Sequence, residues 1–129
     1  DELLEYKQWL YEIYSKALFN SDRISIAGVY PRVSHSRWIN GIIFDDKVEY
    51  SKEKICELVA KKNIDLRPMF YPLSSMPTFR GYVDHQKQHL DNPVSYWCSQ
   101  KGVCLPNGYN ITEEAANYVC DAIIDVVSN

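Results

Sequence analysis

Residues 101–127, KGVCLPNGYNITEEAANYVCDAIIDVV, predict a short strand followed by a helix and decide the fold class. The apolar run at 103–105 is β-favouring and ends at Pro106, which is typical of a strand that stops at a proline. Thr112 is a good helix N-cap, and two glutamates follow it near the positive end of the helix dipole. The apolar residues that come next recur at helical spacing and predict one buried face: Ala116, Val119, Cys120, Ile123 and Val127.

Further helices and strands are predicted upstream of this segment. Ser51 is a good N-cap for one helix, and Asn63 is a plausible left-handed residue at its end. Another short helix follows the pair Asn92–Pro93, ends at Gly102, and is expected to bury Val94, Trp97 and Cys98. The segment 73–90 is the longest candidate loop, and long ordered loops tend to be functional. The remaining predictions are a helix over residues 1–18 and strands over 23–26, 37–44 and 64–71.

The order of these elements predicts an α+β fold. The link between the strands at 23–26 and 37–44 is too short to hold a crossover helix, so we expect these strands to pair antiparallel. The architecture is then two layers, a small and mostly antiparallel sheet with helices packed on it. A length of 129 residues predicts a single domain over residues 1–129.

Composition excludes several classes of function. The net charge is −3, from 14 lysines and arginines against 17 acids, so no basic field attracts nucleic acid or an anionic membrane. The apolar runs are far shorter than the roughly 20 residues of a membrane span. No secretory signal precedes the first helix, and Asp1 instead of Met suggests a processed or excised end. The four cysteines lack metal-site spacing and predict free core thiols in a reducing cytoplasm.

The histidines offer weak signals for chemistry. His85 and His89 have a spacing that suits a metal on a helix, but no third ligand is evident and a solvated surface is favoured. His35 lies between two serines, yet no glycine elbow or placed acid accompanies it, so a loop histidine is expected. We therefore predict no metal site and no catalytic residue in this chain, and disfavour a zinc or thiol enzyme.

Three stretches, taken in order, resemble the C-terminal domain of the DegT/StrS-type aminotransferases. Residues 63–77, NIDLRPMFYPLSSMP, are similar to the family's "gly-ile-x-thr-arg-pro-x-phe-tyr-pro-leu-his". Residues 101–108, KGVCLPNG, are similar to "arg-gly-leu-x-leu-pro-ser-gly", and residues 111–114 match "leu-thr-glu-glu". The first helix and the strand at 38–44 suit the family's order, so the resemblance covers nearly the whole chain. The form of residues 63–77 most resembles the branch that makes 4-amino-4,6-dideoxy sugars, which includes the GDP-perosamine synthases.

The resemblance implies the small domain of a fold-type I aminotransferase that uses pyridoxal phosphate (PLP) on a nucleotide-linked keto-deoxysugar. Such enzymes serve amino-sugar, O-antigen and lipopolysaccharide biosynthesis in the cytoplasm. Their N-terminal large domain carries the Schiff-base lysine and the PLP site, and it is absent from this chain. The expected partners are that domain, the nucleotide sugar and a second subunit of a homodimer. The chain alone is expected neither to bind PLP nor to catalyse. The alternative is a stand-alone binding or interaction module with the same fold.

The resemblance also implies a substrate-binding side. Phe70 and Tyr71 match family positions near the bound sugar, and Ser74 stands where many members have histidine. Arg67 belongs to the same motif, although an exposed strand charge is the favoured interpretation. Both aromatic residues could instead fill a core at the end of a strand. If the strand is regular, Phe70 faces away from Tyr71 and is mostly buried unless the chain bends at Pro72.

Overall fold

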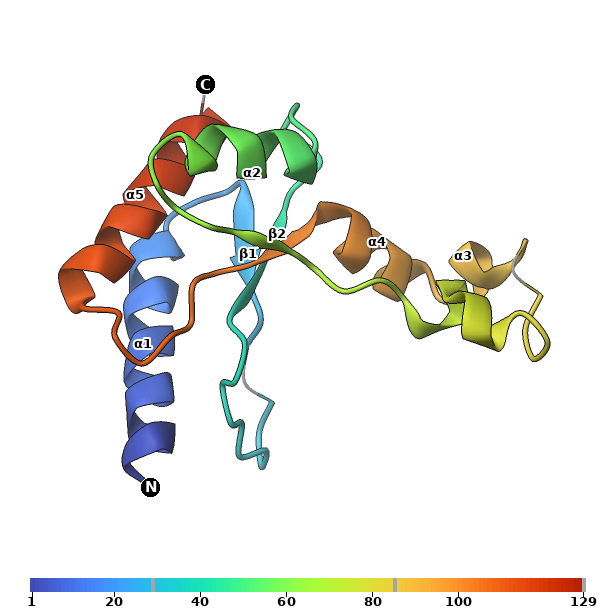
Figure 1. Cartoon of the computed structure of the whole chain (residues 1–129), viewed down its shortest axis with the longest axis horizontal. Helices are drawn as coiled ribbons and strands as arrows, with labels where there is room; N and C mark the ends of the chain where they lie inside the picture. Colours follow the sequence, from blue (N-terminus) through green and yellow to red (C-terminus); the bar gives the residue numbers. More distant parts are fainter. Residues whose placement is uncertain (29, 85, 129) are drawn as a thin grey trace.

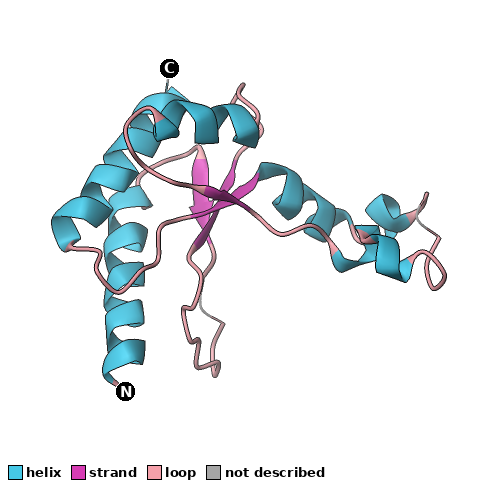
Figure 2. Cartoon of the chain, in the orientation of Figure 1, coloured by secondary structure: helices cyan, strands magenta, loops and turns pink. Residues whose placement is uncertain are grey.

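A computed structural model describes residues 1–28, 30–84 and 86–128 of the chain. It confirms the predicted α+β fold: the described strands form an antiparallel sheet in the order β1-β2-β4-β3, with helices packed against it (Figures 1 and 2). The elements are α1 (Glu2–Leu18), β1 (Ile24–Ile26), β2 (Gly41–Phe44), α2 (Lys52–Ala60), β3 (Arg67–Pro68), the short 3-10 helices η1 (Leu73–Ser75) and η2 (Pro77–Phe79), α3 (Gln88–Asp91), α4 (Pro93–Lys101), β4 (Gly102–Cys104) and α5 (Glu113–Ser128).

The register of the sheet places its apolar residues in one layer. Ile24 of β1 pairs with Phe44 of β2, and Ile42 of β2 pairs with Val103 of β4. Pro68 of β3 then pairs with Val103 from the other side. The pairing of β1 with β2 is antiparallel, as the short link between them predicted.

Helix ends follow the predicted local signals. The Ser51 hydroxyl accepts a hydrogen bond from the Lys54 amide at 3.2 Å, which caps α2. The Thr112 hydroxyl accepts one from the Ala115 amide at 3.2 Å, which caps α5. Asn63 has a φ of 60°, so it is left-handed after α2 as expected.

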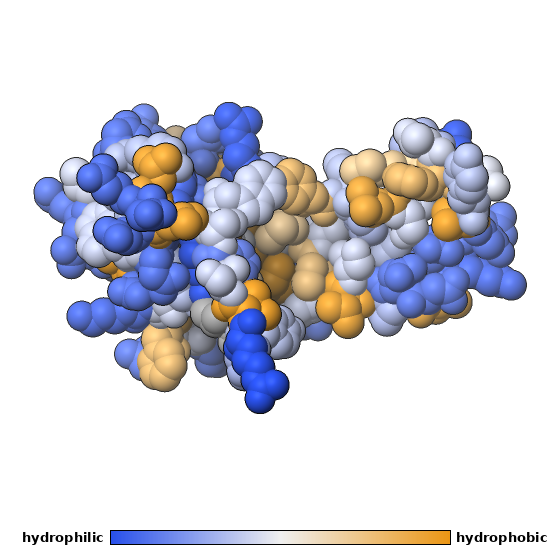
Figure 3. Space-filling model, turned by 90° about the horizontal axis from the view of Figure 1, so that it is seen from below, coloured by the Kyte–Doolittle hydropathy of each residue, from blue (hydrophilic) through white to orange (hydrophobic). Residues whose placement is uncertain are grey.

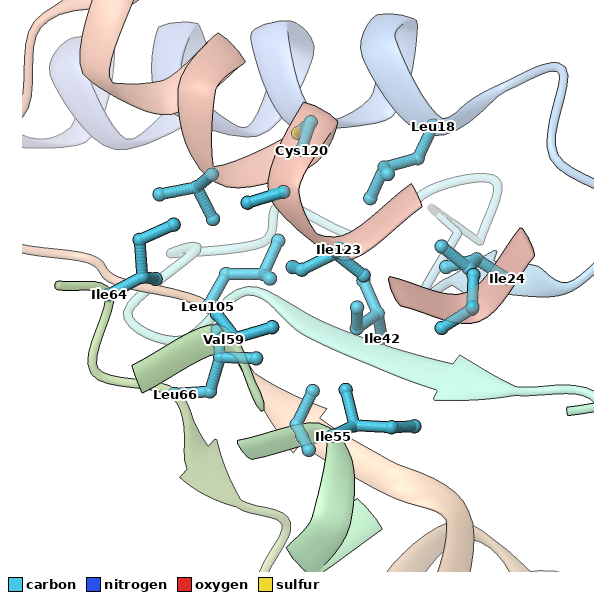
Figure 4. Close-up of a cluster of buried hydrophobic side chains, with 14 of the residues drawn as sticks. Leu18, Ile24, Ile42, Ile55, Val59, Ile64, Leu66, Leu105, Cys120 and Ile123 are labelled. Atoms are coloured by element: carbon cyan, nitrogen blue, oxygen red, sulfur yellow. The ribbon is translucent and has the colours of Figure 1, made fainter. Parts of the chain in front are cut away.

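The core lies between the sheet and helices α1, α2 and α5. Every residue of the predicted α5 stripe is buried, and Figure 4 shows Cys120 and Ile123 of that stripe beside Ile42 and Leu105. Leu10 and Tyr14 of α1 are also fully buried. The helical spacing of Leu3, Leu10 and Tyr14 predicts that all three share one buried face, but Leu3 is exposed.

Two predicted strands are shorter than expected. The strand predicted over 37–44 begins at Gly41, because Arg37 has a φ of 50°, which lies outside the β region. The strand predicted over 64–71 is reduced to Arg67–Pro68. Pro68 lies on the edge strand, where a proline is tolerated, and the Met69 amide still donates to the Gly102 carbonyl oxygen at 2.9 Å before the chain leaves the sheet.

Helix α4 does not bury the face that its apolar spacing predicted. Val94 is 71% exposed, Trp97 is also exposed and Cys98 is half-buried. The cause is the position of α4, which projects from the sheet into an arm with α3, η1 and η2, away from α1 and α5 (Figure 1). Residues 73–90, expected to be irregular or weakly helical, carry these short helices.

The structure describes all four cysteines but only one histidine of the His85–His89 pair. Cys104 and Cys120 are buried, Cys56 and Cys98 are half-buried, and all four are free. His85 lies outside the described residues, so the predicted surface role of the His85–His89 pair stays a prediction.

No helix in the described part of the chain is long and apolar enough to cross a bilayer.

Candidate functional site

Tyr71 lines an open groove of about 650 Å³, here named the Tyr71 groove. The groove lies where the chain leaves the sheet, and Pro72, the start of α2 and the end of α4 form its other walls. The Tyr71 side chain is 74% exposed. Lys52 Nζ lies 5.9 Å from the centre of the Tyr71 ring and donates a hydrogen bond to the Ser99 carbonyl oxygen, which ties α2 to α4.

Hydroxyls and amines dominate the lining of the Tyr71 groove. Ser75 Oγ donates to the Pro72 carbonyl oxygen at 2.7 Å, which stabilises the turn beside Tyr71. Ser74 Oγ donates to the Tyr96 hydroxyl at 3.4 Å, and Tyr96 lines the groove. Lys101 also lines it and pairs with Asp46 at 3.0 Å. These groups can hydrogen-bond a polar ligand and orient it, which is the chemistry of a binding site.

Phe70 points away from the Tyr71 groove, as alternation along the chain predicted. Its ring lies nearly parallel to that of Trp38, with an interplanar angle of 16° and 6.2 Å between ring centres. The expected burial of Phe70 is wrong, because its side chain is 60% exposed. The extended strand that would have carried it into the core ends at Pro68.

Arg67 lies apart from the Tyr71 groove. Its guanidinium pairs with the Asp65 carboxylate at 2.7 Å, and its side chain is exposed. It lines a second groove of about 640 Å³, which has Leu105, Ile111 and Tyr118 among its walls. Of the four predicted site residues, only Tyr71 lines the Tyr71 groove; Ser74 lies behind its wall and bonds to Tyr96, and Phe70 and Arg67 lie elsewhere.

The sequence did not predict the contacts of Trp38 and Asn107 near Phe70. Asn107 Nδ2 donates to the carbonyl oxygens of Arg37 at 3.1 Å and of Trp38 at 2.5 Å. Asn40 Nδ2 donates to Asn107 Oδ1 at 3.3 Å. An amide side chain in the Pro-Asn-Gly turn was a possible signal, because short polar side chains in turns bond nearby backbone groups.

The described residues do not fit a PLP site. Such a site needs a free lysine amine, an acid against the pyridine nitrogen and groups that hold the phosphate. Six lysine amines form ion pairs with carboxylates: Lys47, Lys54, Lys61, Lys62, Lys87 and Lys101. The amines of Lys7 and Lys52 donate to backbone carbonyl oxygens. The ninth lysine, Lys16, is exposed on α1 beside Tyr11 and Phe19, where no described arginine or second lysine lines the surface to hold a phosphate. No step that uses PLP can therefore be assigned to the described residues of this chain.

Burial shifts the pKa values of three ionisable groups in α1 and α5. Burial raises the pKa of the Cys120 thiol to about 12. Burial also raises the pKa of Tyr14, whose hydroxyl donates to the Pro106 carbonyl oxygen at 2.7 Å. Burial lowers the pKa of Lys7. Because these residues stabilise the packing of α1 and α5, their shifts are structural and do not mark a catalytic group.

Comparisons with known proteins agree with this fold. Residues 1–124 match the model of the DegT/DnrJ/EryC1/StrS aminotransferase family. The GDP-perosamine synthase of Vibrio cholerae is 25% identical over 95% of this chain and 32% of its own length. The dTDP-4-amino-4,6-dideoxy-D-glucose transaminase of Escherichia coli is 36% identical over 57% of this chain, which corresponds to 19% of the length of the transaminase.

Solved structures show the same fold. The structure of DesV from S. venezuelae superposes with a TM-score of 0.82 at 15% identity, over 100% of this chain and 33% of that one. The chain spans about a third of the length of the curated relatives that it matches over nearly its whole length. Because the family model covers nearly all of it, this chain belongs to the DegT/DnrJ/EryC1/StrS aminotransferase family.

Proposed function

We propose that this chain is the C-terminal small domain of a PLP-dependent aminotransferase that acts on a nucleotide-linked keto-deoxysugar. The observation that carries the proposal is the family match over residues 1–124, in a chain that spans about a third of its relatives. Two of these relatives are named as a GDP-perosamine synthase and a dTDP-amino-sugar transaminase, which supports a nucleotide-linked sugar as the substrate.

In this proposal, an N-terminal large domain binds PLP and this chain does not. When bound there, PLP supplies the electron sink for moving the amino group. This chain then closes one side of the site, in a homodimeric enzyme of amino-sugar and lipopolysaccharide biosynthesis in the cytoplasm. The lysine contacts described above support this division, since the amines of Lys52 and Lys101 in the Tyr71 groove are already engaged.

Tyr71 is proposed as the sugar-side contact. Its exposed phenol can donate and accept hydrogen bonds, and Pro72 and the Ser75 hydrogen bond restrain the backbone beside it. A restrained side chain loses little entropy when it binds a ligand. Ser74 and Tyr96 are proposed to complete the polar wall, and neither needs to gain or lose a proton for this task.

The test is expression of the complete open reading frame that encodes this chain. We expect a lysine-bearing PLP domain upstream of Asp1 and transfer of an amino group from glutamate to a GDP- or dTDP-linked 4-keto-6-deoxysugar. A PLP-loaded product that leaves every such sugar unchanged would contradict the proposal. The chain alone, mixed with PLP and treated with borohydride, should retain no stoichiometric adduct on one lysine.

The alternative function is a stand-alone binding module with the same fold. It is favoured only by the lack of fit between the described residues and a PLP site. The complete reading frame separates the two functions, because a module requires that no PLP domain is encoded beside it.

A further inference from the structure

The arm formed by η1, η2, α3 and α4 has no hydrophobic core among its described residues. Within 73–101, the buried residues that the structure describes are Gln88 and Ser99, and both are polar. Fixing the backbone of one residue costs about 1–2 kcal/mol of conformational entropy, which burial of apolar surface normally offsets. The sheet and helices α1, α2 and α5 share such a core, but the arm does not reach it. The arm therefore needs cover from a surface outside the described residues.

Helix α4 presents apolar side chains to this missing surface. Residues 92–100, NPVSYWCSQ, contain no charged side chain, although most of them are exposed. Val94 and Trp97 are exposed, as is Leu90 of α3, and we name these three residues the arm face. Figure 3 shows hydrophobic residues gathered on the arm, at the right of the view. Aromatic and aliphatic side chains without charges are typical of the centre of a protein interface.

The α4 part of the arm face lies opposite the Tyr71 groove. A helix turns about 100° per residue, so Val94 and Trp97 lie on one side of α4. Residues Tyr96, Ser99 and Gln100 lie on the other side and line the groove. Helix α4 is thus a wall with the groove in front of it and the arm face behind it. A partner that covers the arm face therefore also holds this wall of the groove in place.

We propose that the arm face is the docking surface for the remainder of the parent protein, namely its N-terminal large domain. The chain spans about a third of the length of the relatives that it matches over nearly its whole length, so the remainder is the larger body. The identity of that body as a PLP domain rests on the proposed function. The need for cover rests on the burial and charge of the arm residues.

A second copy of this chain is the less favoured occupant. A stable interface between separate proteins takes about 20–30 residues from each side, and the arm face is much smaller. A domain on the same polypeptide docks at an effective concentration in the millimolar range, so a smaller surface is enough. Tethering therefore favours the large domain.

The test is amide hydrogen exchange, measured by mass spectrometry, in the chain alone and in the protein encoded by its complete open reading frame. In the chain alone, the amides of α4 should exchange much faster than those of α5, whose inner face is buried. In the complete protein, the amides of α4 should exchange at least about tenfold more slowly than in the chain alone. Burial of one valine-sized side chain is sufficient for this factor.

Val94→Asp tests the arm face, and Ser95→Asp is its matched control. Both variants place a negative charge in the first turn of α4, where the helix dipole favours it, but Ser95 lies outside the arm face. Because both side chains are exposed, neither variant should lower the melting temperature of the chain alone. In the complete protein, Val94→Asp should abolish the added protection of α4, whereas Ser95→Asp should retain it.

Three results would overturn the proposal. Protection of α4 equal to that of α5 in the chain alone would show that the arm needs no cover. Protection that rises with the concentration of the chain alone would assign the arm face to a second copy. Unchanged protection of α4 in the complete protein carrying Val94→Asp would place the docking surface elsewhere.

The proposed function fails separately from the docking surface. Protection of α4 that is lost in Val94→Asp, in a complete protein that transfers no amino group to a sugar, would contradict the proposed function alone. An active aminotransferase in which α4 exchanges as fast as in the chain alone would contradict the docking surface alone.

Discussion

Phe44→Ala should cost more stability than Phe70→Ala, although both remove the same ring. Phe44 is 1% exposed and lies in the core, so its loss should cost about 3–5 kcal/mol of unfolding free energy. Phe70 is 60% exposed. Since full burial of such a side chain is worth about 1.5–3 kcal/mol, and an aromatic pair adds about 0.5–1.5, the remaining burial and the Trp38 contact should together be worth about 1–3 kcal/mol.

The assay is urea unfolding of the two variants and the unaltered chain, monitored by circular dichroism and extrapolated linearly to water. Equal slopes are required for the comparison, because a changed slope reports a changed unfolded or folded state. A loss above about 3 kcal/mol for Phe70→Ala would show that the ring is buried in the core and not exposed beside Trp38. Equal losses of unfolding free energy in Phe70→Ala and Phe44→Ala would also contradict the exposed position of Phe70.

Further predictions concern packing and pH. Gly102→Ala should cost about 1–3 kcal/mol, because its Cβ would approach Ile43 Cδ1 and Met69 Cβ at 2.9 Å and the Cys98 carbonyl oxygen still more closely. The control Gly81→Ala, with nothing within 4 Å, should change the melting temperature little, and equal losses would contradict the packing argument. Burial raises the pKa of Cys120 from 9.0 to about 12, so the folded state keeps a proton that the unfolded state loses. Stability is therefore complete below pH 9 and should fall between pH 9 and 12, by up to about 1.4 kcal/mol per pH unit. The measurement is the urea midpoint at several pH values between 9 and 12. In Cys120→Ala this midpoint should fall less with pH than in the unaltered chain. An equal fall in both would refute Cys120 as the cause.

Local signals in the sequence predicted the body of the fold correctly. Ser51 and Thr112 cap helices because their hydroxyls bond amides three residues away, and such contacts can be inferred from spacing alone. The α5 stripe is also buried as predicted. The spacing of Val94 and Trp97 is equally helical, but periodicity shows only that a face is apolar and not which element covers it.

The candidate site was less predictable because its contacts are distant in sequence. Tyr71 lines a groove, yet most of the walls of that groove come from α2, α4 and the residues before α2. Asn107 bonds to Trp38, which precedes it by 69 residues, and no local pattern encodes such a pairing. The burial predicted for Phe70 was wrong because β3 covers only Arg67–Pro68 and the chain leaves the sheet after Met69, before Phe70.

The most direct test of the central claim is kcat/KM for the keto sugar in the complete PLP-loaded enzyme. The comparison is between the unaltered enzyme, Tyr71→Phe and the control Tyr82→Phe, which changes a more exposed phenol on the arm. Loss of one neutral hydrogen bond should lower kcat/KM about 2- to 13-fold in Tyr71→Phe, with the PLP spectrum unchanged and Tyr82→Phe unaffected. Unchanged kcat/KM in Tyr71→Phe would contradict the claim that this chain forms the sugar side of the site.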